Sequence, residues 1–304
     1  MSAAEVYPHV TMRRCPVCQT CEPREFCTHA GVPFVRCASC QSLYYGVEPD
    51  WTRIAQIYRD DYHRLRGHSD NPAVEAAKRA TMLRYLRLVG RLGPPGHRFI
   101  EVGCSAGAGL ATAAAAGWDV AGVELSAAAA EVARQRPGVR AVYTGRLEEA
   151  PLADGQTDVI ALFDVLEHID PPQGTLATIH RLLRPGGLVL IVTPDGGSLS
   201  ARLLKAHWPH LFVEHVVLFS RRALRRCLET AGFQVARMGF AWKRINLDML
   251  ARHATIHPHV VGGALLRTFR RVLPGPLLRL DIPFNIGEFY VIARRGRTGA
   301  RPHE

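Results

Sequence analysis

The chain has 304 residues, 47% of them hydrophobic and 21% charged, a length suited to one large domain with an accessory piece or to two domains. This composition excludes a wholly disordered, collagen-like or mucin-like protein. The formal net charge of +11 is compatible with a nucleic acid or an anionic surface as partner. However, almost all the basic residues are arginines in an alanine-rich chain. We therefore do not expect nucleic acid as the main partner.

Two signals for membranes or export are missing from the sequence. No run approaches the roughly 18 to 20 apolar residues that a membrane-spanning helix needs. Residues 1–20 lack the apolar core of a signal peptide. We therefore expect a soluble, cytoplasmic protein.

Six of the eight cysteines lie before residue 41, which in a chain without a secretion signal favours metal binding over disulfides. Four of them form two Cys-x-x-Cys pairs at the spacing of a zinc ribbon, a segment too short to fold without its metal. The predicted ligands of a structural zinc ion are Cys15, Cys18, Cys37 and Cys40. We interpret Cys21, Cys27 and His29 as bystanders, although any of them could replace a predicted ligand.

Two helices are predicted after the cysteine-rich segment. Apolar residues recur at intervals of three and four from 51 to 65, and a second such pattern begins at Asn71-Pro72 and runs to about Leu92. The Gly-Pro-Pro-Gly run at 93–96 then marks a boundary. We predict a zinc ribbon at 1–47, a helical connector or lid at 48–92, and a larger domain at 93–304.

From Arg98 onward, short apolar runs alternate with helical stretches, a pattern typical of an α/β fold with a parallel sheet covered on both faces. The predicted strands cover 99–102, 120–123, 141–143, 159–163, 188–193, 233–240 and 289–293. The predicted helices cover 107–116, 126–135, 173–183, 197–206 and 220–231.

A glycine-rich turn follows the first of these strands, with Gly103, Gly107 and Gly109 in it and Glu101 two residues before. A carboxylate at this position would repel the pyrophosphate of a dinucleotide, whereas a cofactor with an amino-acid end and a cationic sulfur tolerates it. Glu124 ends the second strand, where an acidic side chain can accept hydrogen bonds from both ribose hydroxyls.

Five motifs in succession resemble those of the class I S-adenosylmethionine (SAM)-dependent methyltransferases: residues 101–107, 122–126, 145–149, 163–168 and 183–187. The resemblance implies a Rossmann-like, doubly wound, seven-stranded sheet whose last strand is antiparallel. It also implies cofactor contacts at the methionine end, the ribose, the adenine edge and the floor of the site. By position these fall on Glu101, Gly103, Ser105, Gly107, Glu124, Leu125, Leu147, Glu148 and Asp164. Ser105 stands where the family usually has glycine.

The outer parts of the chain are similar to bacterial methyltransferases that carry an amino-terminal zinc ribbon. In that group a tyrosine-bearing helix covers the cofactor site, which implies this role for Tyr58 and Tyr62, with plain core packing as the alternative. Residues 245–284 match least and lie between the last two strands, a common place for a substrate cap. Within them, residues 260–280 mix leucines with arginines and could lie on a membrane surface or pack on the domain.

Histidine is the natural base near neutral pH for an acceptor that loses a proton on methylation. His168 follows the fourth strand at the edge where ligands bind, and His215 lies in an aromatic segment after the fifth strand. Both are candidate catalytic residues; the alternative for His168 is that it caps the loop with Glu167. A second metal site made by Asp164, Glu167 and His168 is a further possibility.

These observations lead to a SAM-dependent methyltransferase with a structural zinc ion. The expected acceptor is a hydroxyl group of a small or carrier-linked metabolite such as a sugar, polyketide or glycolipid. An RNA methyltransferase is the rival enzyme, since a ribbon and a basic chain are compatible with RNA. A non-catalytic SAM-binding or assembly protein is the third alternative.

Overall fold

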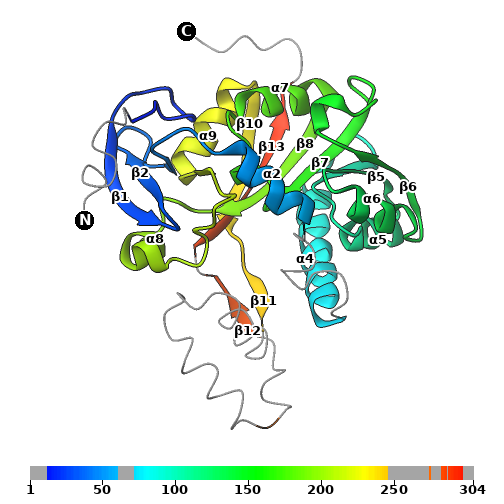
Figure 1. Ribbon diagram of the computed structural model, residues 1–304. Coiled ribbons are helices and arrows are strands. Elements are labelled where there is room, and N and C mark those ends of the chain that lie inside the picture. Colours follow the sequence, from blue (N-terminus) through cyan, green and yellow to red (C-terminus); the bar gives the residue numbers. More distant parts are fainter. Residues whose placement is uncertain (1–11, 61–71, 246–273, 275–281, 286, 297–304) are drawn as a thin grey trace.

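The computed structural model describes residues 12–60, 72–245, 274, 282–285 and 287–296. Figure 1 shows a small N-terminal sheet on the side of the molecule that carries α8 (Leu199–Leu204) and α9 (Arg221–Thr230), with the central sheet beside it. No helix in these ranges is both long and apolar enough to cross a membrane.

The central sheet has seven strands in the order β10-β13-β8-β7-β4-β5-β6. Within this sheet β13 alone runs opposite to the other six strands, which confirms the predicted Rossmann-like class. In chain order the strands are β4 (Arg98–Val102), β5 (Asp119–Glu124), β6 (Val139–Thr144), β7 (Thr157–Phe163), β8 (Leu183–Pro194), β10 (Phe233–Phe240) and β13 (Glu288–Arg295).

The two faces of this sheet are covered by different helices, because alternate residues of each strand point to opposite sides. One face packs against α4 (Pro72–Arg91), α5 (Ala108–Ala115) and α6 (Ala127–Arg134). The other packs against α7 (Gln173–Leu182), α9 and the N-terminal sheet. On β8, Leu190 belongs to the first core and Ile191 to the second.

The N-terminal sheet has the order β1-β2-β3-β9, all antiparallel. Its strands are β1 (Pro23–His29), β2 (Val32–Cys37), β3 (Leu43–Tyr45) and β9 (Val217–Leu218). The fourth strand comes from the segment between β8 and α9, so the ribbon and the larger domain share one sheet. The two parts also share a core, since Phe34 and Tyr44 lie in the same buried cluster as Ile160 and Ile191.

The helix predicted at 197–206 is shorter in the structure. It divides into α8 and a single 3₁₀ turn at Lys205–His207, because Lys205 adopts a left-handed conformation with φ of +46°. In contrast, β8 begins at Leu183, five residues earlier than predicted, and takes in the Arg-Pro-Gly-Gly run.

Three sequence predictions fall wholly or partly outside the described residues. The helix α2 is described over Trp51–Asp60, which includes the backbone at Tyr58, while Tyr62 lies outside. The proposed membrane-facing segment also lies outside, apart from position 274. The predicted cap is described at its ends, where β11 (Lys243–Ile245) pairs antiparallel with β12 (Ile282–Phe284).

The turn between β4 and α5 has a conformation that disfavours side chains. Gly103, Ser105 and Gly107 have φ values of +71°, +53° and +76°. A Cβ atom on Gly103 would come within 2.4 Å of the Val165 side chain, so this position requires glycine. Ser105 occupies the left-handed region without that freedom, while its backbone N–H donates to Glu124 Oε2 at 2.8 Å.

We predict that Ser105→Gly raises the free energy of unfolding by about 0.5 to 1 kcal/mol, because glycine removes the strain of a side chain at positive φ. Chemical denaturation measures the change. Ala111→Gly, inside α5, is the control and should lower stability by a similar amount. A marked loss of stability in Ser105→Gly would show that the hydroxyl group contributes more than the strain costs.

Candidate functional site

Three carboxylates converge where the strands β4, β5 and β7 end, at the carboxyl edge of the sheet. Glu124 Oε2 accepts the Ser105 N–H at 2.8 Å, and its Oε1 accepts the Ser126 N–H at 2.9 Å. Asp164 follows β7 with a φ of +53°, and its N–H donates to Val192 O at 2.9 Å. Glu101 lies on β4 between them. The predicted residues of the glycine loop are therefore tied to Glu124 by a direct hydrogen bond.

Glu101 is buried in an unusual way for an acid. Only 7% of it is exposed, and no group of the described residues hydrogen-bonds its Oε2 atom. Burial raises the pKa of Glu101 to about 8; the nearby Lys78 acts in the opposite direction, and Glu124 adds to the rise. A buried carboxylate with an unused acceptor atom fits a site that receives a cationic ligand.

The other residues predicted to touch the cofactor line the same edge. Leu125, just after β5, has 50% of its surface exposed, whereas Leu147 is buried at the start of a 3₁₀ turn. Glu148 in that turn is exposed and accepts a hydrogen bond from Thr175 Oγ1. A Cβ on Gly107 would lie 2.9 Å from Ala133 Cα, so this glycine allows α6 to pack closely on the loop.

The two candidate catalytic histidines lie together. Their ring centroids are 4.7 Å apart, and Glu167 completes a group whose three ligand atoms lie within 4.8 Å of one another. His168 Nδ1 lies 2.8 Å from Glu214 O, and His215 Nδ1 lies 2.8 Å from His210 O. Since a carbonyl only accepts, each Nδ1 carries a proton and donates it to that carbonyl.

This group differs from the metal site considered from the sequence. Glu167 and His168 are joined by His215, and Asp164 is not a member of the group. Glu167 is fully buried and accepts a hydrogen bond from Thr193 Oγ1 at 2.9 Å. The pairing was invisible in the sequence because 46 residues separate the two histidines.

The cysteine cluster has the composition predicted. The sulfur atoms of Cys15, Cys18, Cys37 and Cys40 all lie within 4.8 Å of one another. The hydrogen bond between Cys15 and Cys40 lowers the pKa of Cys40 and raises that of Cys15. Cys21, Cys27 and His29 are not part of this group, and His29 Nδ1 lies 3.2 Å from Ala206 O.

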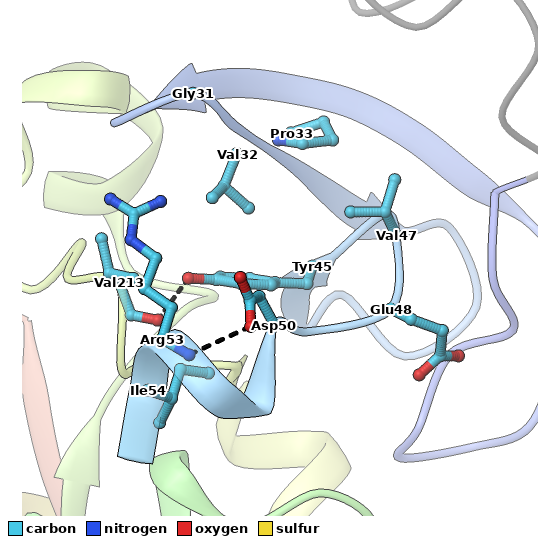
Figure 2. A pocket seen from close by; sticks show the side chains of 10 residues that line it. All are labelled: Gly31, Val32, Pro33, Tyr45, Val47, Glu48, Asp50, Arg53, Ile54 and Val213. Carbon is cyan, nitrogen blue, oxygen red and sulfur yellow. Dashed lines mark hydrogen bonds between the residues drawn. The ribbon is translucent and has the colours of Figure 1, made fainter. Parts of the chain in front are cut away.

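A small pocket of about 100 Å³ lies where the ribbon meets α2. Figure 2 shows the Tyr45 ring on its floor, with the hydroxyl group donating to Val213 O and with Arg53 at its side. This volume is below the ~300 Å³ of typical small-molecule sites, so the pocket does not suit an acceptor. The pocket is relevant because it contains Tyr45, whose hydrogen bond to Val213 O fixes the segment that leads to His215.

Sequence reasoning did not identify Tyr45 or Lys78 as parts of this site. The contact of Tyr45 with Val213 spans 168 residues, so no local pattern indicates it. Lys78 lies on α4 (Pro72–Arg91). Its position one turn before the buried Met82 was the available signal, because residues four apart share a helix face.

Comparison with known proteins supports this reading of the fold. A methyltransferase-domain family model, Methyltransf_23, matches residues 73–237. A protein of Mycolicibacterium smegmatis named as a probable S-adenosylmethionine-dependent methyltransferase is 32% identical over 50% of this chain and 56% of its own length. The ubiquinone biosynthesis O-methyltransferase of Methylococcus capsulatus is 30% identical over 51% of this chain and 67% of its own.

Solved structures agree at the level of the fold. A Bacillus halodurans protein described as a methyltransferase superposes with a TM-score of 0.52 at 18% identity, covering 71% of this chain and 98% of that one. The chain spans about half the length of the first curated relatives that it matches. The family model, in contrast, covers more than half of this chain. The chain therefore belongs to the Methyltransf_23 family of methyltransferase domains.

Proposed function

We propose that the protein is a SAM-dependent methyltransferase that methylates a hydroxyl group of a small or carrier-linked metabolite, such as a sugar, polyketide or glycolipid. The observation that carries this proposal is the group formed by His168, His215 and Glu167, which lies just beyond the carboxyl end of β7. Relatives named for ubiquinone and for malonyl-[acyl-carrier protein] O-methylation support an acceptor of this class.

The residues at the sheet edge fit the cofactor. SAM supplies an electrophilic methyl group on a cationic sulfur. Glu101 offers a buried acceptor atom for the cofactor's ammonium group, and Glu124 has further lone pairs for the ribose hydroxyls. Gly103, Ser105, Gly107 and Asp164 would line the methionine end. Leu125, Leu147 and Glu148 would border the adenine, and Tyr58 and Tyr62 on the connector would cover the site.

The histidines suit the removal of a proton from the acceptor. Methyl transfer is an in-line displacement, so the enzyme must align the acceptor oxygen with the methyl group and take up its proton. His168 or His215 would take up the proton at Nε2, while the backbone carbonyl at Nδ1 holds the ring in the required tautomer. Glu167, buried next to both rings, would stabilise the imidazolium that forms.

We predict that the cofactor releases a proton from Glu101 when it binds. With a pKa of about 8, Glu101 is mostly protonated at pH 7 before binding, and the cofactor's ammonium group favours the ionised form. Apparent affinity for S-adenosylhomocysteine should therefore rise with pH up to about 8. Titration calorimetry at pH 7 in two buffers of different ionisation enthalpy should show release approaching one proton.

Glu101→Gln should abolish this proton release, whereas Glu131→Gln, an exposed acid on α6, should retain it. Equal heats in the two buffers for the unaltered protein would exclude Glu101 from the cofactor site. A folded protein that binds neither SAM nor S-adenosylhomocysteine would contradict the proposed activity.

We predict that His215→Ala lowers methyl transfer by a factor of about 10² to 10⁴, the usual contribution of a general base. Affinity for S-adenosylhomocysteine should change less than twofold, since His215 acts on the acceptor. The assay follows label from SAM into metabolite extracts. His97→Ala, an exposed histidine before β4, should be fully active. Full transfer by both His168→Ala and His215→Ala would rule out the histidines as bases.

The same three side chains also form a possible metal site, since two imidazoles and a carboxylate are a donor set that suits Zn²⁺, Mn²⁺ or Fe²⁺. An ion there would act as a Lewis acid on the acceptor oxygen. Metal analysis distinguishes the two mechanisms. A second ion that is lost in His215→Ala, together with transfer that a chelator abolishes, would favour the metal over the base.

We also propose that the four cysteines bind one structural zinc ion, because four thiolates close a tetrahedral site and leave no position for substrate. Metal analysis should find about one zinc per chain in the ribbon. Cys37→Ser should lower the zinc content and the thermal stability of the whole chain, since the ribbon core continues into that of the sheet. Cys21→Ser, which alters an exposed cysteine, is the control. Unchanged zinc in Cys37→Ser would contradict the assignment.

A further inference from the structure

The helix α4 turns one face toward the glycine loop. Glu75, Lys78 and Met82 lie on this face, at intervals of three and four residues. Glu75 forms an ion pair with Arg136 at 2.9 Å, and Arg136 Nε donates to Ala106 O within the loop at 3.0 Å. The N-terminal part of this face is thereby anchored to the loop through Arg136.

The other end of the face reaches the buried acid of the site. Met82 is 2% exposed, and a Cβ on Gly109 would meet both its Cε atom, at 2.8 Å, and Glu101 Oε2, at 2.6 Å. Lys78 is one turn from Met82 and one turn from Glu75. Lys78 therefore lies on the helix face between these two residues, and it is half-buried.

The charges around Lys78 agree with this placement. Glu101, Asp164 and Glu124 all act on its ammonium group and favour its charged form, although burial lowers the pKa of Lys78 overall. These are the three carboxylates at the carboxyl edge of the sheet. Lys78 is thus a cation on α4 that interacts electrostatically with all three acids.

The three carboxylates of this site attract one part of the proposed cofactor and repel another. Its ammonium and sulfonium groups are attracted, but its α-carboxylate would be repelled by like charges a few ångströms away. A cation is needed near that carboxylate, and an ammonium on a flexible four-carbon stem can turn from the acids to the ligand when it arrives.

We propose that Lys78 binds the α-carboxylate of the cofactor's methionyl end. This inference rests on the proposed SAM dependence and adds a contact from α4, outside the loops that follow the strands. Once the cofactor has bound and Glu101 is ionised, Lys78 also offsets the repulsion between the acids of the site and the α-carboxylate of the ligand.

Two ligands that differ only at the amino-acid end test the role of Lys78. S-adenosylhomocysteine has the carboxylate and ammonium groups, whereas 5′-methylthioadenosine keeps the adenine, ribose and neutral sulfur without them. In Lys78→Met, calorimetric affinity for S-adenosylhomocysteine should fall by about 10- to 100-fold, the range for a lost charge-assisted hydrogen bond. Affinity for 5′-methylthioadenosine should change less than twofold. Lys78→Arg should recover part of the lost affinity.

Arg79→Met is the matched control, because it removes an exposed cation from the next position of the same helix. Its affinities for both ligands should be unchanged. Equal losses for the two ligands in Lys78→Met would mean that Lys78 only supports the fold, and no loss for either would remove it from the site. Both results overturn the inference while leaving SAM dependence intact. If the unaltered protein binds neither ligand, the proposed function itself fails.

Discussion

The antiparallel pairing of β3 with β9 is the constraint on which the arrangement of this molecule depends. Leu43 pairs with Leu218 and Tyr44 with Val217, which joins the ribbon to the segment that follows His215. Ser220 Oγ donates to Cys40 O at 2.6 Å, and Arg36 Nη1 donates to Gly196 O at 2.8 Å, so the contact extends beyond the two strands. The ribbon therefore packs directly against the larger domain through a shared sheet and hydrogen bonds.

Because of this pairing, the ribbon also helps to position His215. Tyr45 holds Val213 through its hydroxyl group and Val216 through its backbone N–H, at 3.2 Å, on either side of His215. The position of the His215 ring relative to His168 thus depends on residues more than 160 positions away in the chain. The zinc ion that we propose for the four cysteines would in this way support the proposed base without contacting substrate, because it would stabilise the strand that positions His215.

The end of β7 connects the two halves of the site. Asp164 belongs to the group of acids beside the glycine loop, and Glu167 and His168 follow within one 3₁₀ turn to form the group with His215. The proposed methyl donor would then lie beside Asp164, and the proposed acceptor would lie beside His168, four residues later in the same loop. The acid-rich side suits a cationic sulfur, and the histidine side suits a hydroxyl group that must lose its proton.

Local pattern by itself determined much of this protein. Apolar runs and glycine turns predicted the seven strands of the central sheet, since burial on both faces leaves a continuous apolar signature. The two Cys-x-x-Cys pairs predicted the sulfur cluster, because ligand spacing is a local property. Only the tertiary structure decided the rest: that β9 completes the ribbon sheet, that His215 replaces Asp164 beside Glu167 and His168, and that Lys78 faces three acids. Each of these depends on contacts between residues far apart in the chain, whose partners no local periodicity specifies.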